Sequence, residues 1–351
     1  MMAQKTTSDE TKAKKDTSLE DMKASLAKAC QAHIDPSAEL MSLKRLSGGA
    51  SQETWSFNIE VAGKSLPLIL RRAPGGQRDA DKETALPLAT EAALIDLADT
   101  VAHIRVPPVR FVLAPEDNLG EGFIMDHVEG ETIARKILRD AEFEAIRPDL
   151  ARQCGEILGR LHAIPIEQCP ELRTAPAHEE LAQYRQTYIA HDHPHPVFEL
   201  AFKWLADNAP KNPRITLVHG DFRNGNLMIT PEVGIAAVLD WELAHLGDPM
   251  EDLGWLCVNS WRFGQIDKPV GGFGQREELF AAYEKSSGIP VDPEQVRYWE
   301  ILGTLKWGIM CTLMYEAFRN GTDRSVERAA IGRRASETEI DLLHLLAPQH
   351  Q

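Results

Sequence analysis

The sequence predicts an α+β protein of two lobes, with a small N-terminal lobe built on an antiparallel sheet and a larger, mainly helical C-terminal lobe. The chain of 351 residues exceeds the size at which one hydrophobic core usually stops growing. Residues 54–61 alternate apolar and polar side chains, which is typical of a half-buried strand. In the second half of the chain, apolar residues instead repeat at helical spacing. The best example is the set Leu150, Cys154, Ile157, Leu158 and Leu161.

The order of these patterns along the chain predicts where each lobe lies. Residues 1–17 are polar and poor in large apolar groups, so we expect a disordered tail there. Helical spacing over 19–33 predicts a helix that leads into the first lobe, which we place at residues 18–129. The second lobe then takes residues 130–351. Within the first lobe we expect two hairpins, over 54–72 with a turn at 62–64 and over 109–128, and a helix over 83–99 between them.

Composition limits the classes of function. The formal net charge is −15 and the pI is near 5.3, which argues against a nonspecific nucleic-acid binder because such proteins display basic surfaces. The five cysteines form no CxxC pair, so reduced thiols in a cytoplasmic protein are expected. The N-terminus lacks the apolar core of a secretory signal. The apolar stretch over 301–318 contains charged residues, so we interpret it as a buried helix and expect no membrane association.

The densest group of chemistry-bearing residues lies between 217 and 253. An apolar run delivers His219, Gly220 and Asp221 into a polar turn, Asn226 follows five residues after Asp221, and a second apolar run ends at Asp240. Phosphoryl transfer needs one carboxylate to meet the proton of an attacking hydroxyl group, and an amide and a second carboxylate to hold magnesium against phosphates. Asp221, Asn226 and Asp240 have the chemistry for these three roles.

These motifs, together with Asp240-Trp-Glu and Gly247-Asp-Pro, resemble the aminoglycoside phosphotransferase and choline kinase family. The pattern is most similar to the kinase-like domains related to those fused to acyl-CoA dehydrogenases. The resemblance covers residues 40–256 and implies a bilobal protein-kinase-like fold that uses ATP and Mg²⁺. It also implies Asp221 as the catalytic base, with Asn226 and Asp240 as the metal ligands. His219, Asp248 and Asp252 are expected to organise the loop, and Arg223 either approaches the transferring phosphate or pairs with a carboxylate.

In the first lobe the resemblance implies a nucleotide site. Gly48, Gly49, Ala50 and Ser51 correspond to the loop that covers the phosphates, and Arg71 takes the place of the phosphate-contacting cation. Arginine keeps the charge and offers a bidentate fork to phosphate oxygens. Glu91 is expected to pair with Arg71, with Glu83 as the competing choice. The hinge at 126–130, with Asp126 and Val128, is expected to meet the adenine edge.

The acceptor is the open question at this level. Aromatic residues after position 254 favour a partly apolar substrate. The resemblance implies a small molecule with a hydroxyl group as the acceptor, either a hydroxyacyl compound or an amino alcohol. Three alternatives stand beside the kinase hypothesis: a catalytically degenerate nucleotide-binding protein, a metal-dependent hydrolase and a protein kinase. The loop His191-Asp-His-Pro-His195 has metal-binding residue types, but its prolines disrupt a regular ligand geometry. His162 is expected to be a polar residue at a helix end. The sequence leaves open the acceptor, ATP against GTP, and the oligomeric state.

Overall fold

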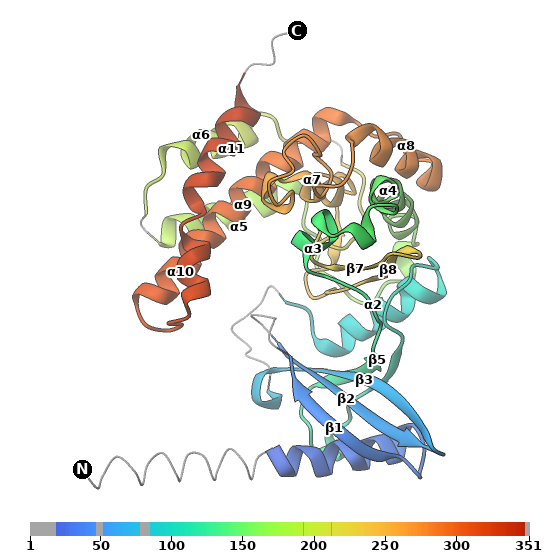
Figure 1. Cartoon of the computed structure of the whole chain (residues 1–351). Coiled ribbons are helices and arrows are strands. Elements are labelled where there is room, and N and C mark those ends of the chain that lie inside the picture. Colours follow the sequence, from blue (N-terminus) through green and yellow to red (C-terminus); the bar gives the residue numbers. More distant parts are fainter. Residues whose placement is uncertain (1–18, 47–51, 78–84, 192, 212, 348–351) are drawn as a thin grey trace, which may run out of the picture. The chain divides into compact units, whose positions relative to one another are not determined.

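A computed structural model describes residues 19–46, 52–77, 85–191, 193–211 and 213–347 (Figure 1). The chain divides into two compact units by its internal contacts. The first unit comprises Met1–Asp96 and Pro107–Val128. The second comprises Leu97–Val106 and Glu129–Gln351, so a short segment before Pro107 belongs with the C-terminal part of the chain.

The first unit is built on a five-stranded sheet in the order β1-β2-β3-β5-β4, and every neighbouring pair is antiparallel. The predicted alternation is confirmed in β2, where Phe57 and Ile59 are buried and Glu60 is exposed. Both residues of the turn from β2 to β3, Ala62 and Gly63, have positive φ, as two-residue hairpins require. The strands are β1 Glu39–Arg45, β2 Glu53–Val61, β3 Lys64–Arg72, β4 Val109–Val112 and β5 Gly122–Asp126.

Three expected boundaries in this unit differ from the structure. Lys64 was expected in the turn but pairs with Val61 as the first residue of β3. The last strand was expected to reach residue 128 and ends at Asp126, although His127 still donates its backbone N–H to Pro67 O. The helix expected over 83–99 is α2, Leu88–Thr100, and its expected beginning, Glu83, lies outside the described residues.

The predicted leading helix is present over residues 19–33 and packs on the sheet. Its apolar side chains recur at the expected spacing, and Leu26 and Cys30 are fully buried. They form one hydrophobic cluster with side chains from three strands of the sheet. The cluster includes Met22, Leu26, Ala29, Cys30, Phe57, Ile59, Leu68, Leu70 and Ile124.

The second unit is mainly helical. The stripe of α4 that the sequence predicted is fully formed, since all five of its apolar side chains are buried. A Cβ on Gly155 would lie 2.3 Å from Leu279 O of α8, so α4 and α8 approach too closely for a larger side chain. The helices are α3 Ala134–Arg139, α4 Leu150–Leu161, α5 Ala177–Ala190, α6 Pro196–Asp207, α7 Met250–Cys257, α8 Arg276–Ser287, α9 Pro293–Arg319, α10 Val326–Gly332 and α11 Ala335–Leu346.

Two small antiparallel pairs carry the predicted catalytic segment. β6 (Thr216–Val218) pairs with β9 (His245–Gly247), and β7 (Leu227–Thr230) pairs with β8 (Gly234–Val238). The apolar stretch over 301–318 lies within α9, most of whose residues are buried in the unit. Within the described ranges, no helix combines the length and apolarity that a bilayer crossing requires.

Candidate active site

The segment from His219 to Asp221 is a tight turn at the end of β6. All three residues of β6 are buried, which fixes the start of the turn inside the unit. Gly220 has φ of 76°, and a Cβ there would lie 2.5 Å from Leu243 O. Only glycine meets both conditions without strain, so the local backbone requires the glycine of His-Gly-Asp.

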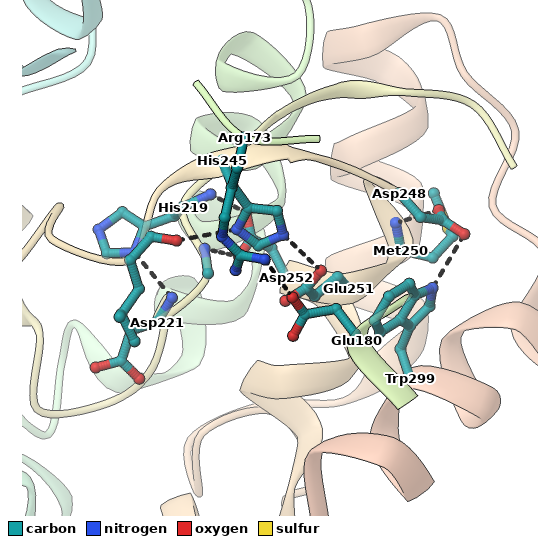
Figure 2. Close-up of polar contacts among 12 residues, drawn as sticks. Arg173, Glu180, His219, Asp221, His245, Asp248, Met250, Glu251, Asp252 and Trp299 are labelled. Carbon is teal, nitrogen blue, oxygen red and sulfur yellow. Dashed lines mark hydrogen bonds and ion pairs between the residues drawn. The ribbon is translucent and has the colours of Figure 1, made fainter. Parts of the chain in front are cut away.

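The carboxylate of Asp252 on α7 holds this turn in place. Its carboxylate accepts hydrogen bonds from His219 N (2.7 Å) and Gly220 N (2.9 Å), as Figure 2 shows. His162 Nε2 lies 3.1 Å from the same carboxylate, and both side chains are fully buried. Burial opposes ionisation of Asp252, but the hydrogen bond and charge of His162 outweigh it and hold the pKa of Asp252 below its usual range. The expectation that Asp252 organises the loop agrees with this arrangement.

His162 has a larger structural role than its place in the sequence indicated. It caps the C-terminus of α4, as expected for a polar residue at a helix end. Its ring also contacts Tyr283 OH at 3.0 Å, in addition to Asp252. These partners are 121 and 90 residues away in sequence, so no local pattern could have identified them.

The ring of His219 links the turn to the following hairpin. Its Nε2 lies 3.1 Å from Leu239 O and its Nδ1 lies 3.2 Å from Asp221 N. A carbonyl oxygen only accepts and a backbone N–H only donates, so these partners require a proton on Nε2 and none on Nδ1. Burial lowers the pKa of His219, which favours the same neutral form. His219 therefore supports the backbone instead of transferring protons.

Three donors orient the carboxylate of Asp221. Its Oδ1 accepts from Trp255 Nε1 at 2.7 Å and from Arg223 Nε at 3.0 Å. Its Oδ2 accepts from Asn226 Nδ2 at 2.6 Å. The side chain is 14% exposed, so one end of it still reaches solvent. The guanidinium of Arg223 also lies 4.5 Å from the ring centroid of Trp261. Arg223 therefore both pairs with the carboxylate of Asp221 and stacks on Trp261.

The bond from Trp255 was not anticipated by sequence reasoning. The sequence places Trp255 among the aromatic residues after position 254, most of which are expected in the core, and predicts no role for it at Asp221. Trp255 and Asp252 are three residues apart on α7 and therefore lie on the same face of the helix. One turn of α7 thus supplies both the carboxylate that holds the turn at 219–221 and the indole beside Asp221.

Asn226 and Asp240 are brought together by the β7–β8 hairpin. Leu227 pairs with Val238, and Leu239 N donates to Asn226 O at 2.9 Å, so the pairing extends one residue past the strands. Asp240 follows directly, with φ of 67°. A positive φ is uncommon for a residue other than glycine, and such positions concentrate at functional sites.

These two residues fit a magnesium ion by their chemistry. Because Asn226 Nδ2 is directed at Asp221, its amide oxygen is left as the group for another contact. An amide oxygen and a carboxylate are ligands that Mg²⁺ accepts when substrate phosphates and waters complete its shell. In the described part of the chain, no group of three or more His, Cys, Asp or Glu side chains is arranged to hold a metal by itself.

In the first unit, Arg71 and Glu91 meet as the resemblance implied. Arg71 Nε lies 3.1 Å from Glu91 Oε1, and Glu91 is 1% exposed. Gln52 joins the pair, because its Oε1 accepts from Arg71 Nε and its Nε2 donates to Glu91 Oε2 at 3.2 Å. Gln52 had no expected role. The competing carboxylate, Glu83, lies outside the described residues, as do Gly48, Gly49, Ala50 and Ser51.

The expected hinge coincides with the boundary between the two units, which falls after Val128. The carboxylate of Asp126 accepts two hydrogen bonds from Arg110, at 2.5 and 2.7 Å. Its backbone N–H donates to Pro108 O at 2.9 Å. The side chain of Asp126 is therefore committed to its neighbour on β4.

The histidine-rich loop after α5 uses its side chains locally. His191 Nδ1 donates to Thr187 O at 2.8 Å. His195 contacts Glu339 at 3.2 Å and stacks on Phe198, with ring centroids 4.6 Å apart. The intervening Asp192 lies outside the described residues. These contacts give the two histidines structural partners and do not support the hydrolase alternative.

Comparisons with known proteins agree with this site. Residues 42–289 match the family model described as the phosphotransferase enzyme family. Acyl-CoA dehydrogenase family member 10 of Mus musculus is 28% identical over 273 residues, which cover 71% of this chain and 24% of the relative. Acyl-CoA dehydrogenase family member 11 of Gallus gallus is 26% identical over 337 residues, which cover 87% of this chain and 41% of the relative. This chain thus spans less than half the length of either relative.

A solved structure shows the same fold. A candidate aminoglycoside phosphotransferase from Ralstonia eutropha superposes with a TM-score of 0.70 at 20% identity, over 92% of this chain and 97% of that chain. A likeness at this identity supports the architecture and leaves the acceptor undetermined.

Proposed function

The chain belongs to the phosphotransferase enzyme family. We propose that it is a small-molecule kinase that transfers the γ-phosphoryl group of ATP to a hydroxyl group in a Mg²⁺-dependent reaction. The observation that carries the proposal is the placement of Asp221. The buried carboxylate of Asp252 holds the turn that carries Asp221, and three donors orient the Asp221 side chain. Asn226 and Asp240 lie next to it, at one end of the β7–β8 hairpin.

In this proposal Asp221 accepts the proton of the acceptor hydroxyl. A positioned general base of this kind contributes roughly 10²- to 10⁴-fold to the rate. Arg223 contacts Asp221 Oδ1 and stacks on Trp261, so its charge is held beside the carboxylate. From there Arg223 stabilises negative charge on the transferring phosphoryl group. Asn226 and Asp240 would hold Mg²⁺, which neutralises phosphate charge when bound.

The nucleotide site is proposed for the first unit. The Arg71–Glu91 pair, reinforced by Gln52, fixes a cation at the end of β3 that can contact phosphates. We propose that Gly48, Gly49, Ala50 and Ser51 cover those phosphates with backbone amides. The backbone near Asp126 and Val128 would contact the adenine edge.

The proposed acceptor is a hydroxyacyl compound or an amino alcohol. The similarity to the acyl-CoA dehydrogenase family members favours the first, although this chain matches only part of their length. A catalytically degenerate nucleotide-binding protein is the alternative that the experiment below separates from a kinase.

The first test is calorimetric binding of ATP with and without Mg²⁺, comparing the parent with Asp240→Ala. Asp207→Ala is the matched control, because that carboxylate is exposed and paired with Lys203. Binding that requires both Mg²⁺ and Asp240 supports the nucleotide site. Failure of the folded parent to bind ATP removes the ATP-dependent reaction.

The second test measures acceptor-dependent ADP release with Asp221→Asn. We expect ATP binding to persist and turnover to fall by about 10²-fold or more, since the amide cannot accept the proton. Undiminished turnover contradicts the assignment of Asp221 as the base. If the parent binds ATP but phosphorylates none of a broad set of hydroxy compounds, the degenerate nucleotide-binding alternative is favoured.

A further inference from the structure

A cavity with a volume of about 380 Å³ opens on the second unit. It lies between the segment that follows α2, the helix α4 and the turn of the β7–β8 hairpin, all of which belong to that unit. None of its lining residues has a place in the candidate active site. Its volume falls in the range of small-molecule sites, so we considered which class of ligand its lining would accept.

The charged side chains of the lining are mostly cationic. They are Arg105, Arg152 and Arg160, with Glu156 as the single carboxylate that lines the cavity. This excess is local, because the whole chain has a formal net charge of −15. A cavity lined mainly by charges of one sign raises the local concentration of ligands of the opposite sign. The lining therefore favours an anion.

The charge of Arg152 is balanced within the chain. Its guanidinium donates to both carboxylate oxygens of Asp149, each at 2.6 Å, and to Glu156. The contact with Arg152 also offsets the charge of Glu156, so the one acidic side chain of the lining repels an incoming anion less than an unpaired carboxylate would.

The charges of Arg105 and Arg160 are not balanced in this way. Arg105 Nη1 donates to Ile235 O at 3.2 Å, and Arg160 Nη1 donates to His103 O at 3.1 Å. Among the residues that the structure describes, neither guanidinium forms an ion pair. A neutral carbonyl holds a guanidinium in place without cancelling its charge. Both side chains are exposed and keep unused N–H donors, so a ligand can reach them.

The rest of the cavity lining is partly apolar. Ile157, Val233 and Ile235 lie beside the charged residues. The two isoleucines are buried, whereas Val233 is 43% exposed. An apolar surface next to two cations suits a ligand that has an uncharged body as well as an anionic group.

The cavity is separate from the proposed magnesium site, although both lie on the β7–β8 hairpin. Ile235 lines the cavity, while Asn226 and Asp240 lie at the end of the hairpin that Val238 closes. At the usual rise of a strand, Ile235 and Val238 are roughly 10 Å apart. Arg105 connects the two regions, because its side chain donates to Ile235 O and its backbone O accepts from Val238 N at 2.9 Å.

We propose that this cavity binds a small molecule through a dianionic phosphate group, with Arg105 and Arg160 as the residues that bind the phosphate. A phosphomonoester carries a charge of about −1.5 to −2 near neutral pH, which matches two arginines that have no carboxylate partner. The planar fork of arginine also fits phosphate oxygens in a bidentate arrangement. A single carboxylate group would balance only one of the two cations. The site lies outside the proposed transfer reaction and takes no part in it.

Calorimetry without nucleotide or Mg²⁺ tests the proposal at about pH 8, where the phosphate group is a dianion. The probes are phenyl phosphate, inorganic phosphate and methyl phenyl phosphate, which is a monoanion. We expect phenyl phosphate to bind most tightly and methyl phenyl phosphate to bind most weakly. Equal binding of phenyl phosphate and inorganic phosphate also supports the phosphate site and identifies free phosphate as its ligand.

Two variants test the phosphate-binding residues. Arg105→Met and Arg160→Met should each weaken binding of phenyl phosphate by about 10-fold, the lower end of the range for a hydrogen bond to a charged group, because both side chains are exposed. Arg319→Met is the matched control, since it removes the same charge from an arginine that is 60% exposed on α9. The Val238 amide, which donates to Arg105 O, should exchange more slowly when phenyl phosphate is bound to the parent.

Variants of the candidate active site separate this cavity from the proposed nucleotide site. Arg71→Met and Arg223→Met remove cations that are proposed to contact phosphates of the nucleotide, and both variants should bind phenyl phosphate as the parent does. Conversely, Arg105→Met should bind ATP and Mg²⁺ with the affinity of the parent. A parent that binds phenyl phosphate through Arg105 but does not bind ATP supports the cavity site and removes only the ATP-dependent reaction.

Three results would overturn the proposal. The first is a folded parent that shows no saturable binding of phenyl phosphate or inorganic phosphate. The second is binding that survives in Arg105→Met and is lost in Arg71→Met or Arg223→Met, which would place the phosphate at the candidate active site. The third is an equal loss of binding in Arg319→Met and Arg105→Met, which would assign the effect to net charge alone.

Discussion

Replacement of Asp252 by asparagine tests whether one buried carboxylate holds the catalytic turn. Asp252 accepts hydrogen bonds from His219 N and Gly220 N, and its carboxylate contacts His162, with all of these groups buried. An asparagine has the same shape but offers only one acceptor oxygen. Its amide NH₂ must therefore face one of the former donors, and at least one buried N–H loses its partner.

The expected loss of stability follows from these contacts. Hydrogen bonds to charged groups contribute about 1.5–3 kcal/mol each, and a buried donor left unsatisfied costs about 1–3 kcal/mol. The asparagine keeps one of the backbone bonds in weaker, neutral form. We therefore expect Asp252→Asn to lower the free energy of unfolding of the second unit by about 2–4 kcal/mol. This overlaps the lower part of the range of about 3–5 kcal/mol for breaking a buried ion pair.

Urea unfolding followed by tryptophan fluorescence measures this change, because the second unit contains every tryptophan except Trp55. Hydrogen exchange of the Gly220 amide gives a local readout, since that amide donates to Asp252. Asp207→Asn on the exposed face of α6 is the matched control. A difference below about 0.5 kcal/mol, the range of ordinary surface substitutions, together with unchanged exchange at Gly220 would refute the reasoning.

The same carboxylate has a predictable dependence on pH. Its pKa is lowered in the folded protein, so its contribution to stability is complete above the unfolded value of about 3.9 and is lost as the pH falls through the folded value. Asparagine does not titrate. Above about pH 5 the stability difference between parent and Asp252→Asn should therefore stay constant, and it should shrink progressively as the pH falls below that value. If the stability difference between parent and Asp252→Asn shrinks already near neutral pH, a titrating group other than Asp252 causes the change.

Three further predictions concern single contacts. Trp255→Phe removes the donor to Asp221 Oδ1 and should reduce kcat by roughly 10- to 100-fold with little change in ATP affinity, whereas Trp204→Phe should have no effect in the same steady-state assay. Glu91→Gln weakens the hold on Arg71 and should raise the KM for ATP more than it lowers kcat; a selective loss of kcat would argue against a nucleotide-positioning role. Gly155→Ala places a Cβ 2.3 Å from Leu279 O and should destabilise the second unit by about 1–3 kcal/mol in urea unfolding, because α4 and α8 must separate.

The sequence predicted those parts of the fold that depend on local periodicity. The alternation in β2 and the apolar stripe of α4 each reflect one element with one buried face, so the pattern determines the element before any partner is known. Boundaries were less well predicted. Lys64 fits either a turn or a strand by composition, and only its pairing with Val61 decides between them.

In the candidate site, too, sequence reasoning predicted the local arrangement and missed the contacts between distant elements. Asp221, Asn226 and Asp240 lie in the β7–β8 hairpin and in the turn directly before it. Their spacing along the chain therefore determines how they are arranged in space. The contacts of Trp255, His162 and Lys306 join elements far apart in sequence. A tryptophan or a lysine on a helix has many possible partners, and only tertiary packing selects Asp221 for Trp255 and an aromatic environment for Lys306.

The double role of α7 limits how the acceptor preference of this chain can change. One turn of that helix supports the backbone of the turn at 219–221 through Asp252 and contacts the proposed base, Asp221, through Trp255. A substitution on this face that reshapes the acceptor side also disturbs the catalytic turn, and such variants would lose rate as they change substrate. Divergence toward new acceptors, in nature or by directed evolution, should therefore leave this face of α7 unchanged.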